Sequence, residues 1–330
     1  MYKRQGLFPN LPANPDVQWE SQATTNIALD FGLFKNRIKG TVEVYNRKTT
    51  DLFVLAQVTR TTGFRAINRN IGEMRNRGIE LNLTGDVLKL GDFTWTLNVI
   101  HTINRNKILS LGAEAEYVDG TSIVRVGIPL GSHYVVKWGG VNPGNGDPLY
   151  YDLDGNVTPT YNSANNQAFG TFIPPKFGSF TNTFSYKGLE LAVFFVYESQ
   201  KQLFNNQTFF NQNLTGIPVA TTNKDSRMLN AWTTPGQVTD IPRLDAARQF
   251  SSRDLEDGSF LRLRNVTLAY TVPTAWAKNL KMRSLRAYVS GQNVLTFSKF
   301  TGFDPEDSNN IQLSQFPVPR VFTFGLDLGF

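Results

Sequence analysis

The sequence ends in VFTFGLDLGF, residues 321–330, where apolar and polar residues alternate strictly. Every second residue back from the C-terminus is large and apolar: Phe330, Leu328, Leu326, Phe324 and Phe322. Successive side chains of a β-strand point to opposite faces of a sheet, so this stretch predicts a strand with one apolar and one polar face. In a soluble sheet protein the apolar face packs on a core. In a β-barrel that spans a membrane it faces lipid, and the polar face lines the lumen.

The composition excludes several classes of protein. Charged residues make up 18% of the 330 residues, below the roughly 25% of an average soluble domain. No run of about 18 apolar residues predicts a transmembrane helix. Cysteine is absent and the only histidines are His101 and His133, too few for a histidine-based metal site. The net charge of +6 comes from scattered basic residues, so no nucleic-acid partner is expected.

The same period of two recurs along most of the chain. In TNIALDFGLF, residues 25–34, the apolar positions 27, 29, 31 and 33 alternate with Asn26, Ala28, Asp30 and Gly32. Nine strands are predicted on this basis, at residues 19–34, 36–47, 73–86, 92–104, 176–186, 188–200, 259–272, 283–297 and 319–330. A further strand is predicted within a long loop, at residues 133–141.

The predicted connections alternate between short and long. The short ones lie at residues 34–37, 88–92, 186–188 and 273–283, and the long ones at about 50–72, 104–175, 200–257 and 298–318. In an up-and-down antiparallel sheet this alternation gathers all short turns at one rim and all long loops at the other. Outer-membrane barrels have this organisation, with short periplasmic turns and long extracellular loops. The expected fold class is therefore all-β, a large antiparallel transmembrane β-barrel.

An odd number of strands is unexpected, because bacterial single-chain barrels have an even number. The first residues, MYKRQGLFPN, also lack the apolar segment of a secretory signal. Both features lead us to expect that residues 1–330 are the C-terminal segment of a larger barrel, partial and open as given.

Six segments carry a resemblance to a known family: NPDVQWE at 14–20, NIGEMRNRGIELNL at 70–83, VKWGGVNPGNGDPLYYDLDGNVT at 136–158, DGSFLRLRNVTLAYTVP at 257–273, GQNVLTFSKFTGFDPE at 291–306 and PRVFTFGLDLGF at 319–330. In this order they resemble the C-terminal half of SusC/RagA-type TonB-linked outer-membrane proteins of Bacteroidota. The resemblance implies a barrel of about 22 strands, with an N-terminal plug, a TonB-contacting segment and a signal peptide that this chain lacks.

The resemblance also implies a function and partners. Proteins of this family pair with a SusD-like surface lipoprotein and import oligosaccharides or peptides with energy delivered by TonB. Without a plug, this chain alone is expected not to transport. The alternatives are a siderophore or cobalamin receptor of the same architecture and, in another class, a soluble β-sandwich that binds carbohydrate.

One short motif suggests a metal site. Asp152, Asp154 and Asn156, with Gly155, faintly resemble a calcium loop, but the distal bidentate glutamate is missing. Asp-Gly is also a strong hairpin signal, so a type I′ turn is the favoured interpretation. No cofactor is expected.

Other residues are candidates for binding. Loop aromatic residues are expected to stack on a ligand or contact the lipoprotein, namely Tyr150, Tyr151, Tyr161, Phe209, Phe210 and Trp232. The acidic residues Asp254, Glu256 and Asp257 are expected to be a solvated run, and no catalytic set is found, so an enzyme is not expected. The terminal strand, from Phe322 to Phe330, is expected to face membrane lipid, and its aromatic end resembles the signal read by the barrel-assembly machinery.

Overall fold

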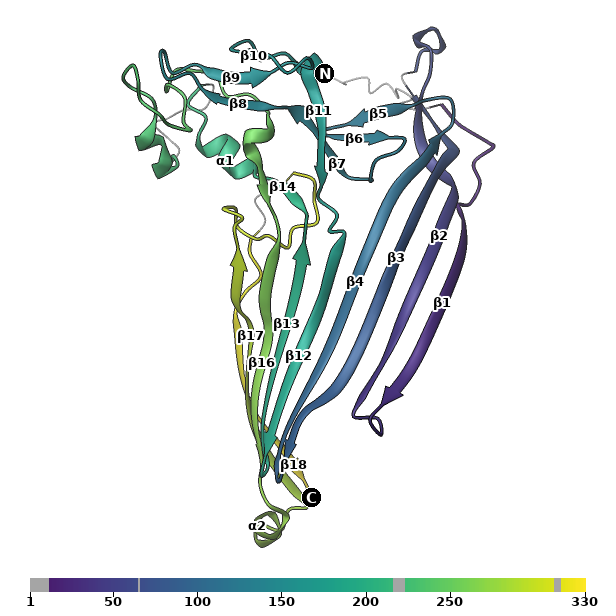
Figure 1. The fold of residues 1–330 in the computed structure, drawn as a ribbon, viewed down its shortest axis with the longest axis vertical. Coiled ribbons are helices and arrows are strands. Elements are labelled where there is room, and N and C mark those ends of the chain that lie inside the picture. The colour runs from purple at the N-terminus through teal and green to yellow at the C-terminus, as the bar shows by residue number, and fades with distance from the viewer. Residues whose placement is uncertain (1–11, 65, 216–222, 312–315) are drawn as a thin grey trace, which may run out of the picture.

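A computed structural model describes residues 12–64, 66–215, 223–311 and 316–330. In this part of the chain nine strands form one antiparallel sheet, the main sheet, in the order β1-β2-β3-β4-β12-β13-β16-β17-β18 (Figure 1). The strands are β1 (Ser21–Leu33), β2 (Ile38–Gln57), β3 (Ala66–Leu90), β4 (Phe93–Leu111), β12 (Lys176–Tyr186), β13 (Leu189–Ser199), β16 (Phe260–Thr271), β17 (Ser284–Ser298) and β18 (Val321–Gly329). All nine strands predicted for this sheet are confirmed.

Two strands are longer than predicted. The prediction of a loop at residues 50–72 is wrong for most of these residues, because β2 continues to Gln57 and β3 begins at Ala66. The pairing of these strands shifts register between Thr49 and Leu52 and again between Leu52 and Phe53. Such bulges break the apolar alternation without ending the strands, which explains why periodicity missed these segments.

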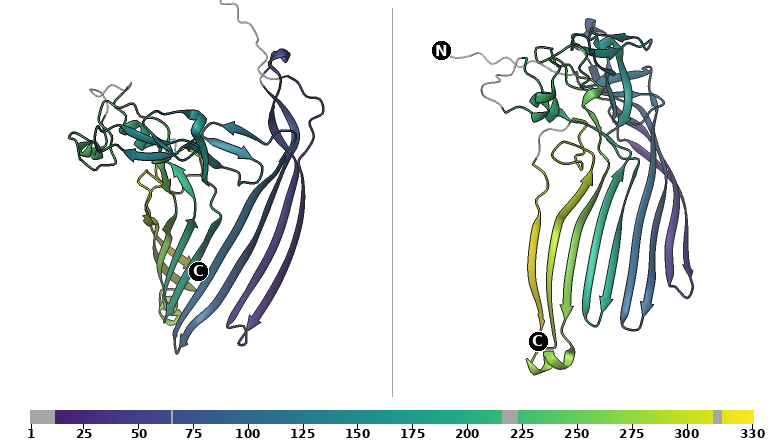
Figure 2. Two further views of the ribbon diagram at one scale, coloured as in Figure 1. Left: turned by 45° about the horizontal axis from the view of Figure 1, so that its top comes forward. Right: turned by 60° about the vertical axis from the view of Figure 1, so that its left-hand side comes forward.

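The connections are sorted by end, as predicted (Figures 1 and 2). The short ones lie at one end of the main sheet, where α2 (Thr274–Asn279) occupies the connection from β16 to β17. The described loops at the other end contain three small sheets, two of which include a strand from the segment expected as one strand at 133–141. That expectation is wrong, because β7 (Ser132–Val136) and β8 (Trp138–Val141) belong to different sheets.

The small sheets and helices at this end are short. They are the four-stranded sheet of β5 (Glu116–Asp119), β6 (Ser122–Arg125), β7 and β11 (Asn166–Thr171), the three-stranded sheet of β8, β9 (Pro148–Tyr151) and β10 (Val157–Thr158), the pair β14 (Gln202–Phe204) and β15 (Leu255–Asp257), the helix α1 (Asn206–Asn211), and the 3₁₀ turns η1 (Arg60–Thr62), η2 (Ser163–Asn165), η3 (Ser226–Asn230) and η4 (Ser252–Asp254).

The register of the main sheet puts the apolar residues of all its strands on one face. Directly paired residues share a face, and one row of such pairs crosses the sheet through Leu33, Ile38, Gly85, Leu97, Asn182, Val193, Val266, Gly291 and Phe322. The next row, on the opposite face, is Gly32, Lys39, Thr84, Asn98, Thr181, Phe194, Asn265, Gln292 and Val321. The main sheet therefore has one largely apolar face and one largely polar face, which we call the apolar face and the polar face.

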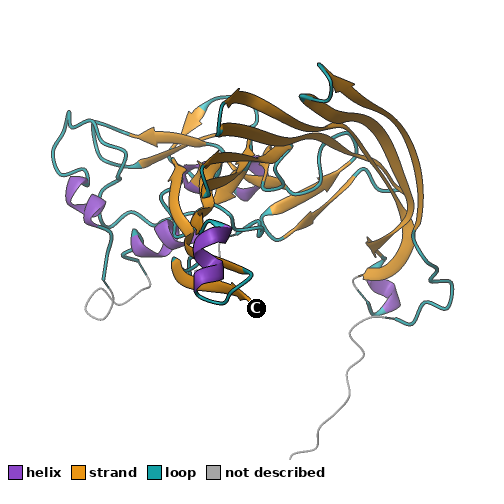
Figure 3. Ribbon diagram, turned by 90° about the horizontal axis from the view of Figure 1, so that it is seen from below, coloured by secondary structure: helices purple, strands orange, loops and turns teal. Residues whose placement is uncertain are grey.

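Nothing in the described part of the chain covers the apolar face. Leu29 is 65% exposed and Phe324 is 81% exposed. The main sheet is a single curved layer, seen from below in Figure 3. A β-sandwich needs a second sheet packed on the apolar face of the first, so the soluble sandwich considered above is contradicted.

The two buried hydrophobic clusters in the described part of the chain lie at the long-loop end of the main sheet. One joins Val54, Ile108, Leu111 and Val124, and the other joins Val135, Phe204 and Phe209. The first cluster packs β6 against the long-loop ends of β2 and β4, and the second packs β7, β14 and α1 together. None of the helices in the described ranges is long and apolar enough to cross a membrane.

Candidate ligand-binding site in the loops

Two loop segments far apart in the sequence meet at the long-loop end. Val136 forms a parallel β-bridge with Ser251, and the amide of Trp138 donates a hydrogen bond of 3.0 Å to the hydroxyl of Ser252. These contacts bring the indole of Trp138 beside Arg253 of η4 and close to Arg248, which precedes η4 in the sequence. The sequence did not identify Trp138, Arg248 or Arg253 as candidates. More than 100 residues separate Trp138 from the two arginines, so no local motif joins them.

A cavity of about 330 Å³ lies at this junction. Its lining is polar and charged apart from one indole: Trp138, Thr208, Gln212, Arg227, Asp240, Arg248, Ser252, Arg253 and Glu256. The guanidinium of Arg253 lies 5.1 Å from the Trp138 ring centroid, and it donates a hydrogen bond of 3.1 Å to Gln212. Burial, with the nearby charge of Arg248, lowers the pKa of Arg253 to about 10, so this side chain is still a cation at neutral pH.

Arg248, which lines this cavity, forms a buried ion pair with Asp254. Their side chains are 5% and 0% exposed. Burial raises the pKa of Asp254 to about 6, although the charge of Arg248 opposes the rise. Oδ2 of Asp254 and Nε and Nη1 of Arg248 are buried with no hydrogen-bond partner in the protein. The expectation that Asp254 belongs to a solvated acidic run is therefore wrong.

Two more acidic residues near the cavity have partners of their own. Asp225 binds the guanidinium of Arg227 at 2.6 Å, and hydrogen bonds from Arg227 lower the pKa of Asp225 to about 2. Glu256 accepts hydrogen bonds from Asn205 at 2.8 Å and from the amide of Thr301 at 2.7 Å. The cavity thus presents hydrogen-bond donors and acceptors beside an aromatic ring, which suits the hydroxyl groups of a sugar or the amide groups of a peptide.

Two of the aromatic residues that the sequence suggests for ligand binding are buried and pack against other rings of the fold. Tyr150 is 2% exposed and packs edge-on against Trp138 and Tyr161, with ring centroids 5.6 and 5.3 Å apart. Burial raises the pKa of Tyr150 to about 12. Phe209 is also buried and stacks on Phe250 at 4.0 Å. Tyr150 and Phe209 are therefore unavailable as ligand platforms, contrary to expectation.

The remaining candidates differ in exposure. Trp232 lies against the main chain of Gly146 and donates a hydrogen bond of 3.0 Å from its indole to Pro143. Tyr151 carries the ammonium of Lys137 at 4.4 Å from its ring centroid. Phe210 is 47% exposed. No contact of these residues with a ligand or lipoprotein is tested by the structure, so that role stays a prediction.

The segment from Asp152 to Asn156 forms the turn between β9 and β10. The carboxylate of Asp152 accepts hydrogen bonds from the amide and side chain of Asn156, at 2.7 and 3.0 Å, and they lower its pKa. A type I′ turn needs positive φ at both central residues, and of Asp154 and Gly155 only Gly155 has it, at 86°. The turn is thus confirmed, but its type I′ assignment is wrong. In the described part of the chain no group of three or more acidic or histidine side chains is placed to hold a metal ion.

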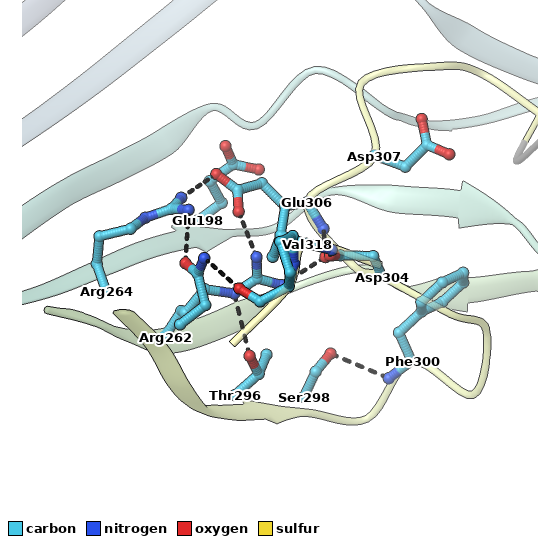
Figure 4. A network of polar contacts seen from close by, with 12 residues as sticks. Glu198, Arg262, Arg264, Thr296, Ser298, Phe300, Asp304, Glu306, Asp307 and Val318 are labelled. Atoms are coloured by element: carbon cyan, nitrogen blue, oxygen red, sulfur yellow. Dashed lines mark hydrogen bonds and ion pairs between the residues drawn. The ribbon is translucent and has the colours of Figure 1, made fainter. Parts of the chain in front are cut away.

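A polar network fixes the long connection from β17 to β18 onto the main sheet (Figure 4). Arg262, 2% exposed on the polar face, contacts Asp304 at 2.5 Å, Glu306 at 2.6 Å and the hydroxyl of Thr296 at 3.0 Å. Arg264 also binds Glu306. Burial opposes the shift, but hydrogen bonds from Arg262 and two main-chain amides lower the pKa of Asp304. These contacts hold the loop against the polar face of the main sheet. No local sequence pattern predicts them.

The structure places the terminal strand at the edge of the main sheet. Leu326 pairs with Ala287 and Phe324 with Val289, on the apolar face. Leu328 and Phe322 lie on the same face, and Phe330 follows the end of β18. That these side chains touch lipid stays a prediction.

Comparison with known proteins agrees with this geometry. The sequence profile of the family "TonB dependent receptor-like, beta-barrel" matches residues 2–294. The TonB-dependent receptor P3 of Formosa agariphila is 30% identical over 96% of this chain and 35% of its own length. The TonB-dependent receptor SusC of Bacteroides thetaiotaomicron is 28% identical over 96% of this chain and 32% of its own length. A solved structure of the RagAB peptide transporter superposes over 100% of this chain and 38% of the matched chain, with a TM-score of 0.90 and 32% identity.

The chain therefore belongs to the TonB-dependent receptor β-barrel family, whose members are outer-membrane transporters and receptors. Within that family it is similar to SusC and to the RagAB peptide transporter. It spans about a third of the length of these relatives.

Proposed function

We propose that this chain forms part of the wall and mouth of an outer-membrane importer that takes up oligosaccharides or peptides. The observation that carries the proposal is the single apolar face that crosses all the strands of the main sheet. A membrane solvates such a face, whereas in water it would be an exposed patch far larger than soluble monomers tolerate. The similarity to SusC and to the RagAB peptide transporter supports import as the activity.

The proposal assigns a role to each end of the sheet. Phe322, Phe324, Leu326 and Leu328 face lipid, and the aromatic C-terminus serves the barrel-assembly machinery. The cavity beside Trp138 and Arg253, on the long-loop side, contacts the imported molecule. A SusD-like surface lipoprotein is the expected partner at this end, and TonB is the expected energy source.

Uptake by cells tests the proposal. We would delete the gene, restore it at its natural length, and measure uptake of fluorescent oligosaccharides, oligopeptides and ferric siderophores with and without TonB. We expect one of the first two substrate classes to enter only when both the gene and TonB are present. Arg253→Gln should lower that uptake, whereas Lys278→Gln, an exposed change at the opposite end of the sheet, should leave it unchanged.

Two results would contradict the proposal. Uptake confined to ferric siderophores would favour the siderophore receptor instead. Uptake of oligosaccharides and oligopeptides that continues without the gene would remove the import function.

A further inference from the structure

A group of four cations lies on the apolar face at its long-loop end. Arg75 and Arg77 of β3 pair directly with Lys107 and Arg105 of β4. On the same face, the next pair toward the short turns is Ile79 with Ile103, about 7 Å away along the strands. The four side chains, which we call the basic cluster, thus begin where the apolar band of the same face ends.

No ion pair in the described part of the chain neutralises the positive charges of the basic cluster. Like charges directly opposite one another destabilise a sheet, and here two such pairs are adjacent. Among the described residues none of the four makes an ion pair. Glu73, two residues before Arg75 in β3, is bound to Lys48 at 2.8 Å, and Glu80 lies on the polar face. Arg77, Arg105 and Lys107 are exposed, so their charges are presented outward.

A cavity adjoins the basic cluster where β12 leaves the edge of β4. It measures about 380 Å³, and all four cations line it together with Pro174 and Pro175. It lies between Pro175, which accepts a hydrogen bond of 2.8 Å from Asn104, and Gly127, which donates one of 2.9 Å to Ile108. Cations beside apolar groups match the boundary between a charged headgroup and its acyl chains.

We propose that the basic cluster binds the phosphate-bearing headgroup of a membrane lipid in the leaflet at the long-loop side. Arginine guanidinium groups bind phosphate oxygens through paired hydrogen bonds, and clustered basic residues at a membrane surface attract anionic headgroups. The bound headgroup neutralises the opposed cations, which explains why the sheet tolerates them. This inference rests on the proposed function, because it requires the apolar face to lie in a membrane.

The test uses the protein at its natural length, purified from membranes in detergent. In the cluster variant, Arg75, Arg77, Arg105 and Lys107 are all changed to Gln. In the control, Lys35, Lys89, Lys278 and Lys281, all exposed and near the short-turn end, are changed to Gln, so both variants lose four charges. Lipid A in mixed micelles is titrated into each protein, and bound lipid is counted by native mass spectrometry, with and without inorganic phosphate as competitor.

We expect the cluster variant to lose affinity for lipid A by about ten-fold or more, and the control to change by less than about two-fold. Equal losses in the two variants would show non-specific charge attraction and overturn the inference. Full displacement of lipid A by millimolar inorganic phosphate would also overturn it, by showing a free-phosphate site. A protein found outside the membrane fraction would instead contradict the proposed function, so the two failures are distinguishable.

Discussion

At the scale of single residues, tyrosines facing glycines on the next strand are a repeated device of this sheet. Tyr45 lies opposite Gly78, and its hydroxyl donates a hydrogen bond of 2.9 Å to Asn104 on the strand beyond. Tyr197 lies opposite Gly178, and its hydroxyl is hydrogen-bonded to the imidazole of His101 on the strand beyond. The missing Cβ of the glycine leaves room for the ring, so one side chain ties three strands together.

Gly78→Ala should therefore destabilise the sheet. An added Cβ would lie 2.1 Å from the carbonyl oxygen of Ile103 and 2.7 Å from the hydroxyl of Tyr45. Overpacking of this kind costs about 1–3 kcal/mol. Gly85→Ala on the same strand is the matched control, because its nearest neighbour would be 3.5 Å away. Urea unfolding in detergent would measure both, and equal midpoints would show that the ring of Tyr45 does not depend on the glycine.

The contacts around the loop cavity join residues that are far apart in the sequence, and such contacts could not be predicted from it. The turn at Asp152 was predictable because its hydrogen bonds join residues four apart. The pairing of Trp138 with Arg253 and of Arg262 with Asp304 depends on how long loops fold back. No local period or motif encodes such contacts, so the sequence predicts a solvated Asp254 although the residue is buried.

At the scale of elements, the terminal strand tests which face meets lipid. Leu326→Arg places a cation on the apolar face of β18 and should cost about 2–4 kcal/mol if the residue lies near the bilayer midplane. Asp327→Arg is a poor comparison, because Asp327 pairs with Arg286 at 3.1 Å. Thr323→Arg is better, since Thr323 lies opposite Ser290 on the polar face of the same strand.

The measurement is the fraction of natural-length protein that assembles into the membrane in a heat-stable form. We expect Leu326→Arg to lower it strongly and Thr323→Arg to leave it near the unsubstituted level. The reverse ranking would mean that the polar face, not the apolar face, contacts lipid.

Strands were more predictable than loops for a physical reason. A strand of the main sheet repeats its apolar side chain every two residues over nine or more residues, which is a strong signal. Bulges at residues 49–53 hid the upper parts of β2 and β3, and the loop strands, mostly of two to six residues, are too short to show a period. Their positions follow instead from the buried clusters around Val54 and Phe204.

At the scale of the whole molecule, the two ends of the sheet differ in a way that fixes its direction in a membrane. The connections at one end are short, whereas the other end carries the small sheets (Figure 2). The charged cavity and the basic cluster also lie at that second end. Outer-membrane barrels direct short turns to the periplasm and long loops outward. We therefore expect the long-loop end to face the cell exterior.

The absence of cysteine from these 330 residues makes this expectation directly testable. Thr160→Cys puts a thiol on an exposed loop between β10 and β11, and Lys281→Cys puts one on the connection from β16 to β17. On intact cells a membrane-impermeant maleimide should label the first variant and not the second, because only the long-loop end is outside. After lysis both should react, and the unsubstituted protein gives the background. Labelling of Lys281→Cys alone would invert the orientation, and would move the loop cavity and the basic cluster to the periplasmic side, where neither could meet an incoming ligand or the outer leaflet.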